Sequence, residues 1–129
     1  MLIVSARKDF TDADRLLDEG HIIRDVNLSN DQTTEVSTGE VIKKTRRKTI
    51  CIFVHGYNNE FFEVNESYQI MESNIRNTPG IAYDEIIGYH WPGGDCALKW
   101  EAAQRRSNAV EEGLGSFWKF SGTEAQQLT

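Results

Sequence analysis

The feature that most constrains this chain is an unbroken apolar run, Ile50 to Val54, that passes directly into His55-Gly56-Tyr57-Asn58. Five consecutive apolar residues, mostly β-branched or aromatic, predict a strand covered on both faces. The glycine predicts a tight turn, and a helical pattern begins near Asn59. A strand, a glycine turn and a helix start, in that order, build a crevice of backbone N–H groups that can bind an anion.

The segment after the turn predicts one amphipathic helix. Asn58 or Asn59 is expected to cap it, and Asn77-Thr78-Pro79-Gly80 to end it. The apolar residues that recur at helical spacing, and so predict one buried face, are Phe61, Val64, Tyr68, Met71 and Ile75.

A second strand and a second helix are predicted beyond that point. Asp84 to Trp91 predicts a buried strand that Pro92-Gly93-Gly94 ends, and Asp95 is expected to cap a helix over Cys96 to Glu112. The alternation of strands and helices implies a parallel sheet. The residues of this helix that are expected to face inward are Leu98, Ala102 and Ala109.

The first 48 residues predict strands and a hairpin. Strands are expected at Leu2 to Val4 and at His21 to Leu28, with a short polar helix or turn over Thr11 to Glu19. Thr33 to Val36 and Glu40 to Lys44 then predict a hairpin. Its turn is Ser37-Thr38-Gly39, with Gly39 in the left-handed conformation.

A basic run, Lys43 to Lys48, follows the predicted hairpin. We interpret it as a solvated strand end and connection, with a nucleic-acid patch as the alternative. The net charge of −6 and the pI of about 5.0 favour the first interpretation, because attraction to phosphate needs a positive surface.

Length and composition indicate one α/β domain over residues 1–129. It divides into N-terminal strands and hairpin (1–48), a β-α-β-α unit (49–112) and a polar tail (113–129).

No apolar stretch approaches the roughly 20 residues that span a bilayer, and no signal peptide is evident. Cys51 and Cys96 make no disulfide framework, so a reduced, cytoplasmic protein is expected. Neither metal-ligand spacing nor a phosphate loop is found, and no cofactor is expected.

The stretch from Ile50 to about Val110 resembles the N-terminal half of an uncharacterised branch of the α/β-hydrolase superfamily. The matching residues are Phe53 to Asn59, Trp91-Pro92, Trp100 and Arg105. The resemblance implies that the Tyr57 amide faces an oxyanion, that Gly56 allows close approach, and that Trp91 and Pro92 line the same crevice.

The candidate crevice residues are therefore His55, Gly56, Tyr57, Asn58, Trp91 and Pro92. The alternative is that His55 and Trp91 only pack the loops. A hydrolase of this kind also needs a nucleophile elbow, an acid and a late histidine. None is found after the Trp-Pro segment, so no catalytic residue is assigned. The expected fold is a truncated α/β-hydrolase-like half-fold, with a mostly parallel sheet, flanking helices and an N-terminal hairpin.

The resemblance also places the Ile50 to Val54 strand at the centre of a full sheet. Without the strand that follows an elbow, one edge is left unpaired, and such an edge is a template for association. We expect a homodimer through this edge, with Phe117, Trp118 and Phe120 nearby; a tail that folds back over the edge is the alternative.

The expected function is a non-catalytic module that acts through homodimerisation or ligand binding. The alternative is an esterase-like hydrolase whose nucleophile half comes from another chain.

Overall fold

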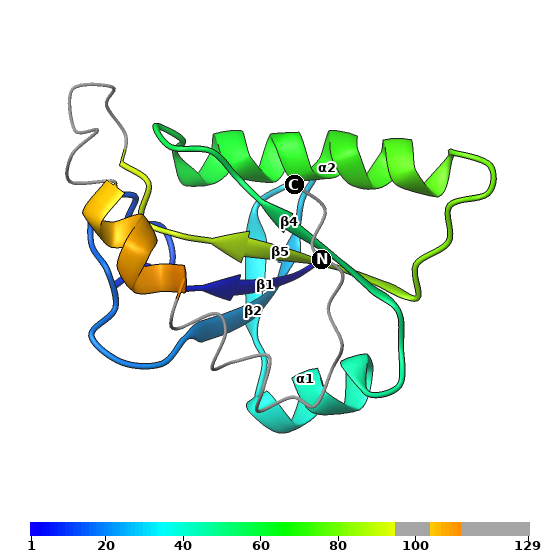
Figure 1. The fold of residues 1–129 in the computed structure, drawn as a ribbon, viewed down its shortest axis with the longest axis horizontal. Coiled ribbons are helices and arrows are strands. Elements are labelled where there is room, and N and C mark those ends of the chain that lie inside the picture. Colours follow the sequence, from blue (N-terminus) through cyan, green and yellow to red (C-terminus); the bar gives the residue numbers. More distant parts are fainter. Residues whose placement is uncertain (95–103, 112–129) are drawn as a thin grey trace.

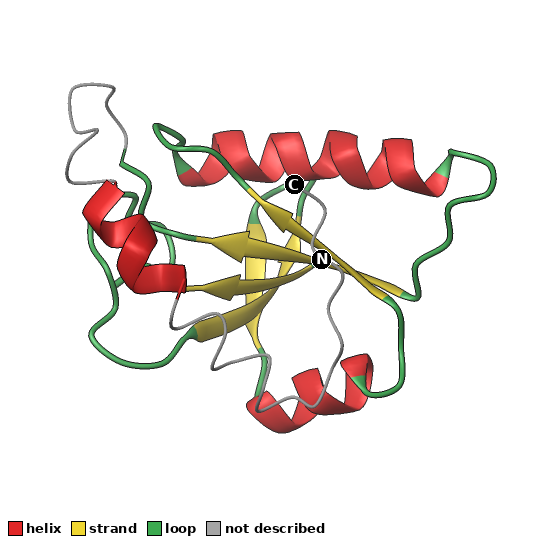
Figure 2. Cartoon of the chain, viewed as in Figure 1, coloured by secondary structure: helices red, strands yellow, loops and turns green. Residues whose placement is uncertain are grey.

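A computed structural model describes residues 1–94 and 104–111 of the chain. These residues form one sheet with helices on both of its faces, as Figures 1 and 2 show. The predicted α/β class, with flanking helices, is thus confirmed. The elements are β1 (Leu2–Ser5), β2 (Ile22–Asn27), β3 (Gln32–Glu35), α1 (Thr38–Thr45), β4 (Ile50–Val54), α2 (Phe61–Arg76) and β5 (Glu85–His90), and residues 104–111 are also helical.

The five strands follow the order β3-β2-β1-β5-β4 across the sheet. β5 lies between β1 and β4 and is parallel to both, whereas β2 is antiparallel to β1 and to β3. Only β2 therefore runs opposite to the other four strands. β4 is the last strand of the sheet in the described part of the chain, which leaves one of its sides without a neighbouring strand there.

The core lies on both faces of this sheet. Ile50 and Ile52 of β4 belong to an apolar cluster that includes Val41 of α1 and Val110 of the 104–111 helix. Cys51 and Phe53 belong to a second cluster on the α2 face. The prediction of a strand covered on both faces is confirmed, because successive side chains of a strand point to opposite faces.

Helix α2 covers one face through Val64 and Tyr68, which are both buried. The Tyr68 hydroxyl lies 2.7 Å from the Tyr89 carbonyl oxygen and 3.0 Å from that of Phe53, so it links α2 to β4 and β5. Met71 was predicted on this buried face, but it is 42% exposed. Asn65 is buried instead, so the buried face of α2 includes Asn65 and leaves Met71 at its exposed side.

The start of α2 differs from the prediction. Its N-cap is Glu60, whose backbone N–H donates to the Glu63 carboxylate at 2.8 Å, rather than Asn58 or Asn59. Asn58 has a φ of 62°. It adopts the left-handed conformation that asparagine tolerates better than most residues, and it turns the chain before the helix begins.

The predicted hairpin between Thr33 to Val36 and Glu40 to Lys44 is wrong, because the second segment is part of α1. Ser37 and Glu40 form a capping box: the Ser37 hydroxyl accepts from the Glu40 N–H at 3.3 Å, and the Glu40 carboxylate accepts from the Ser37 N–H at 2.9 Å. Gly39 is therefore helical rather than left-handed. The hairpin that does form joins β2 to β3.

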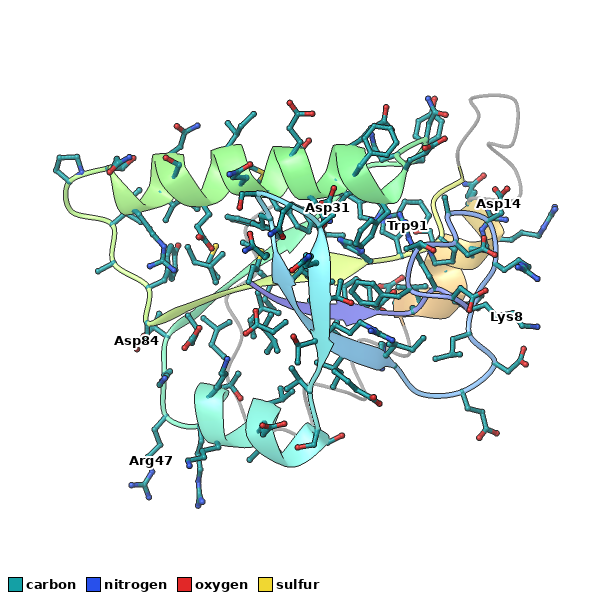
Figure 3. The ribbon with its side chains drawn as sticks, turned by 180° about the vertical axis from the view of Figure 1, so that it is seen from behind. Lys8, Asp14, Asp31, Arg47, Asp84 and Trp91 are labelled. Carbon is teal, nitrogen blue, oxygen red and sulfur yellow. The ribbon has the colours of Figure 1, made fainter. Side chains whose placement is uncertain are left out.

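The basic run begins at the end of a helix and not, as expected, at a strand end. Lys43 and Lys44 occupy the last turn of α1, where the helix dipole favours positive charge. Lys44 pairs with Asp25 at 3.6 Å. Figure 3 shows Arg47 pointing away from the body of the protein.

The structure also describes the N-terminal segments and the 104–111 helix, where some predictions are confirmed and one is wrong. The strands expected at Leu2 to Val4 and His21 to Leu28 are present as β1 and β2, and Thr11 to Glu19 is a turn region with no helix. Ala109 is exposed rather than inward, and its neighbour Val110 is the buried residue. Other predicted features lie outside the described residues, namely Asp95, Leu98, Ala102, Phe117, Trp118, Phe120 and the tail.

Gly88 allows Tyr68 to pack closely against β5. A Cβ at this position would lie 2.6 Å from the Tyr68 ring and even closer to the Ile3 side chain.

Gly88→Ala should therefore lower the free energy of unfolding by about 1–3 kcal/mol, measured by urea denaturation. Gly39→Ala is the matched control. Its Cβ would meet only the Ser37 hydroxyl, at 3.9 Å, and it should stabilise α1 by roughly 0.5–1 kcal/mol. Equal urea midpoints for the two variants would contradict this packing.

Candidate functional site

The candidate site lies where β1, β4 and β5 end. Ser5 is opposite His90, and Val54 is opposite Tyr89, so the three parallel strands end at the same edge of the sheet. We call residues 55–60 the His-Gly loop and residues 91–94 the Trp-Pro loop. Figure 3 places Trp91 near Asp14, at the opposite end of the sheet from Asp84, which precedes β5. Open α/β sheets bind ligands at this end.

The His-Gly loop and the Trp-Pro loop contact each other directly. The Trp91 indole N–H donates to the His55 carbonyl oxygen at 2.8 Å, and the Trp91 backbone N–H donates to His55 Nε2 at 3.2 Å. The two rings stack with centroids 5.7 Å apart. Residues from two separate sequence motifs are thus brought together.

The contacts of the His55 ring assign its tautomer. Nε2 accepts the Trp91 N–H, so the ring proton is on Nδ1, which lies 2.6 Å from the Gly56 carbonyl oxygen and donates to it. Burial and the nearby Arg7 charge lower the pKa of His55 to about 4. His55 is therefore a neutral ring with both nitrogens engaged, and neither nitrogen is free to take a proton from a substrate.

Arg7, which the sequence reasoning missed, holds these loops together. Its side chain is fully buried just beyond β1. Nε donates to the Trp91 carbonyl oxygen at 3.2 Å, and Nη2 donates to the Asn59 carbonyl oxygen at 3.2 Å and lies 3.4 Å from His55 Nε2. Burial lowers the pKa of Arg7 to about 10. An arginine directly after the apolar β1 segment was the one sequence signal for this role.

His90, the last residue of β5, was also missed. It is fully buried, and neither ring nitrogen has a hydrogen-bond partner. Burial and the charge of Arg7 hold its pKa well below the usual value for histidine. Four aromatic rings have centroids 5.7 Å from that of His90, namely those of Phe10, His55, Phe61 and Tyr68.

The other candidate crevice residues lie in the same two loops. Gly56 is exposed, and Tyr57 is 42% exposed. The Asn58 N–H donates to the Gly93 carbonyl oxygen at 3.1 Å, which joins the loops a second time. Pro92 is buried. The role of the Tyr57 amide at an oxyanion stays a prediction.

Two neighbouring arginines differ in their contacts with the site. Arg105 is exposed on the 104–111 helix, whereas its neighbour Arg106 donates to the Pro92 carbonyl oxygen. This bond ties the 104–111 helix to the Trp-Pro loop. Trp100 lies outside the described residues.

Within 1–94 and 104–111, no three His, Cys, Asp or Glu side chains gather closely enough to hold a metal ion. In the same part of the chain, no helix has the length and apolar character to cross a membrane. No serine described by the structure hydrogen-bonds to His55 or His90, as a nucleophile paired with its base would.

Comparison with known proteins identifies a family. The model of a family described as "Alpha/beta hydrolase of unknown function (DUF900)" matches residues 29–121. This span includes the Ile50 to Val110 stretch in which the resemblance was found and extends it at both ends. No curated protein and no solved structure matches the sequence significantly.

The lowered pKa of His55 predicts a loss of stability in acid. A histidine in the unfolded chain has a pKa of about 6.5, so the unfolded state binds a proton that the folded state resists until about pH 4. This contribution to stability is complete above about pH 6.5 and is lost as the pH falls. Between about pH 7 and pH 5, His55 should cost roughly 2 kcal/mol of unfolding free energy.

Urea denaturation at the two pH values measures this effect, and His90 adds to it in the same direction. The His55→Gln variant, which lacks the titrating ring, should lose less stability over the same interval. An equal loss in the variant and the wild type would show that His55 titrates normally.

Proposed function

The chain belongs to the family of α/β hydrolases of unknown function, and we propose that it acts as a non-catalytic α/β-hydrolase-like module that forms a homodimer through the edge of β4. The observation that carries this proposal is the place of β4 in the sheet. The strand whose residues are most completely apolar is also the last one in the order of the described strands.

Within residues 1–94 and 104–111, the edge of β4 lacks the usual protection against pairing. Edge strands are commonly protected by charged residues, proline or a bulge. β4 reads Ile-Cys-Ile-Phe-Val, and its first four residues are buried by side chains from both faces of the sheet. Val54, the last residue, is 47% exposed.

The hydrogen-bond pattern identifies which groups of β4 point outward. The Glu85 N–H donates to the Thr49 carbonyl oxygen at 3.3 Å, and this fixes the alternation of the parallel ladder. The N–H groups of Cys51 and Phe53 then point toward β5, and that of Ile52 points away from it. The described residues offer the outward N–H of Ile52 no strand partner.

A second copy of the chain supplies the simplest complement to this edge. Two β4 strands related by a twofold axis can pair antiparallel, so that each satisfies the outward groups of the other. The pairing would join two sheets into one. An isologous contact of this kind is closed, and it leaves no further edge of the same type exposed.

The contacts of the two histidines support a non-catalytic role. The imidazole of His55 is occupied by Trp91 and Gly56, and His90 is enclosed by aromatic rings. Neither is paired with a serine described by the structure. The His-Gly loop serves here to hold the ends of β4 and β5 together.

A charge on the β4 edge should weaken the dimer. Val54→Lys changes a side chain that is already 47% exposed, so the fold should be retained while edge pairing is opposed. Light scattering over a dilution series should show a dimer for the wild type and a shift toward monomer for the variant. Ile70→Lys is the matched control, since Ile70 is 56% exposed on α2 and lies outside β4. A wild-type monomer at every concentration would contradict the proposal.

A further inference from the structure

Arg7 carries a buried charge with no counter-ion among the described residues. Its Nε and Nη2 atoms are engaged by two carbonyl oxygens and a neutral imidazole, whereas Nη1 has no hydrogen-bond partner. No carboxylate in the described part of the chain lies at ion-pair distance from it. The carboxylate whose charge acts on Arg7 is that of Asp12, and it is bound by Arg15 at 2.6 Å. Buried charges without a partner are strongly destabilising.

His90 presents a second set of unused polar atoms beside this charge. Its ring is fully buried, and both Nδ1 and Nε2 are without partners. A neutral imidazole has one N–H to donate and one nitrogen to accept. Buried polar groups in native proteins are almost always paired, so two such groups in one place call for an explanation.

The two residues lie together at the end of the sheet where ligands bind in this fold class. Ser5 is opposite His90 in the register of β1 and β5, and the Ala6 N–H donates to the His90 carbonyl oxygen at 2.9 Å. Arg7 is the next residue along the chain, and its charge acts on the His90 ring. Both side chains therefore belong to one buried cluster.

We propose that Arg7 Nη1 and the His90 ring form a buried site for a small carboxylate. Nη1 has two unused N–H donors and His90 has one, and the two oxygens of a carboxylate accept such bonds. A water molecule could also accept them, but it is neutral and would leave the charge of Arg7 uncompensated. The carboxylate can come from a free small molecule or from an acidic side chain of a second copy.

Entry to this site requires the two loops to separate. They are joined by the bond from the Asn58 N–H to Gly93 and by the bonds between Trp91 and His55. Opening breaks these bonds and separates the Trp91 and Asn59 carbonyl oxygens that Arg7 joins, but it leaves the strand pairing of the sheet intact, so it is a local opening. The site does not depend on the β4 edge, and its test is separate from that of the proposed dimer.

The full chain, labelled with ¹⁵N, can be titrated with sodium acetate and compared with sodium chloride at equal ionic strength. The His90 ring resonances should shift saturably with acetate alone, and the thermal midpoint should rise with it.

His90→Phe keeps the aromatic packing and removes both unpartnered nitrogens. It should fold with an acetate-free midpoint at or above that of the wild type and lose the acetate-dependent rise. His21→Phe, which changes a histidine that contacts Tyr89 instead, should keep the rise.

The source of the carboxylate is distinguished by protein concentration. If a second copy supplies it, the His90 ring resonances should shift with protein concentration in acetate-free buffer, and acetate should add nothing. Ring resonances that respond to neither acetate nor protein concentration would overturn the proposal. An acetate-dependent rise of equal size in His90→Phe would overturn it as well.

Discussion

Side chains of β4 alternate between two apolar clusters, with Ile50 and Ile52 on one face of the sheet and Cys51 and Phe53 on the other. A strand of this composition is stable only when both faces are covered, and much of the architecture meets that requirement. Helix α2 covers one face, and α1 and the 104–111 helix contribute to the other (Figure 2). Parallel pairing through β5 then brings the ends of β1, β4 and β5 to one place.

The meeting of the three strand ends fixes the two loops of the candidate site against each other. Arg7 links the Trp-Pro loop to the His-Gly loop through carbonyl oxygens, and Trp91 is stacked on His55. The same arrangement buries the charge of Arg7 and leaves both ring nitrogens of His90 without hydrogen bonds. The loops are thus held by contacts that leave polar atoms without partners in the interior, where such atoms are rare in native proteins.

The sequence predicted the elements whose signal is local and periodic. The β4 strand, α2 and β5 follow from apolar patterning, and the meeting of His55 with Trp91 followed from the resemblance. Helix α1 was missed because the Ser37 capping box was taken for a turn. Met71 was misplaced because the packed stripe of α2 is centred near Tyr68, and Met71 lies on its flank. Arg7 was missed because its position just after β1 is a weak signal, and its burial depends on loops that meet only in the folded protein.

The central claim is that β4 has an outward side which a second copy covers, and amide hydrogen exchange measures this side directly. The N–H of Phe53 points toward β5 and should be protected at every protein concentration. The N–H of Ile52 points outward, and its protection should rise as the concentration rises through the dimerisation range. If Ile52 is unprotected at all concentrations, or fully protected even at high dilution, the edge is not covered by a second copy and the account is wrong.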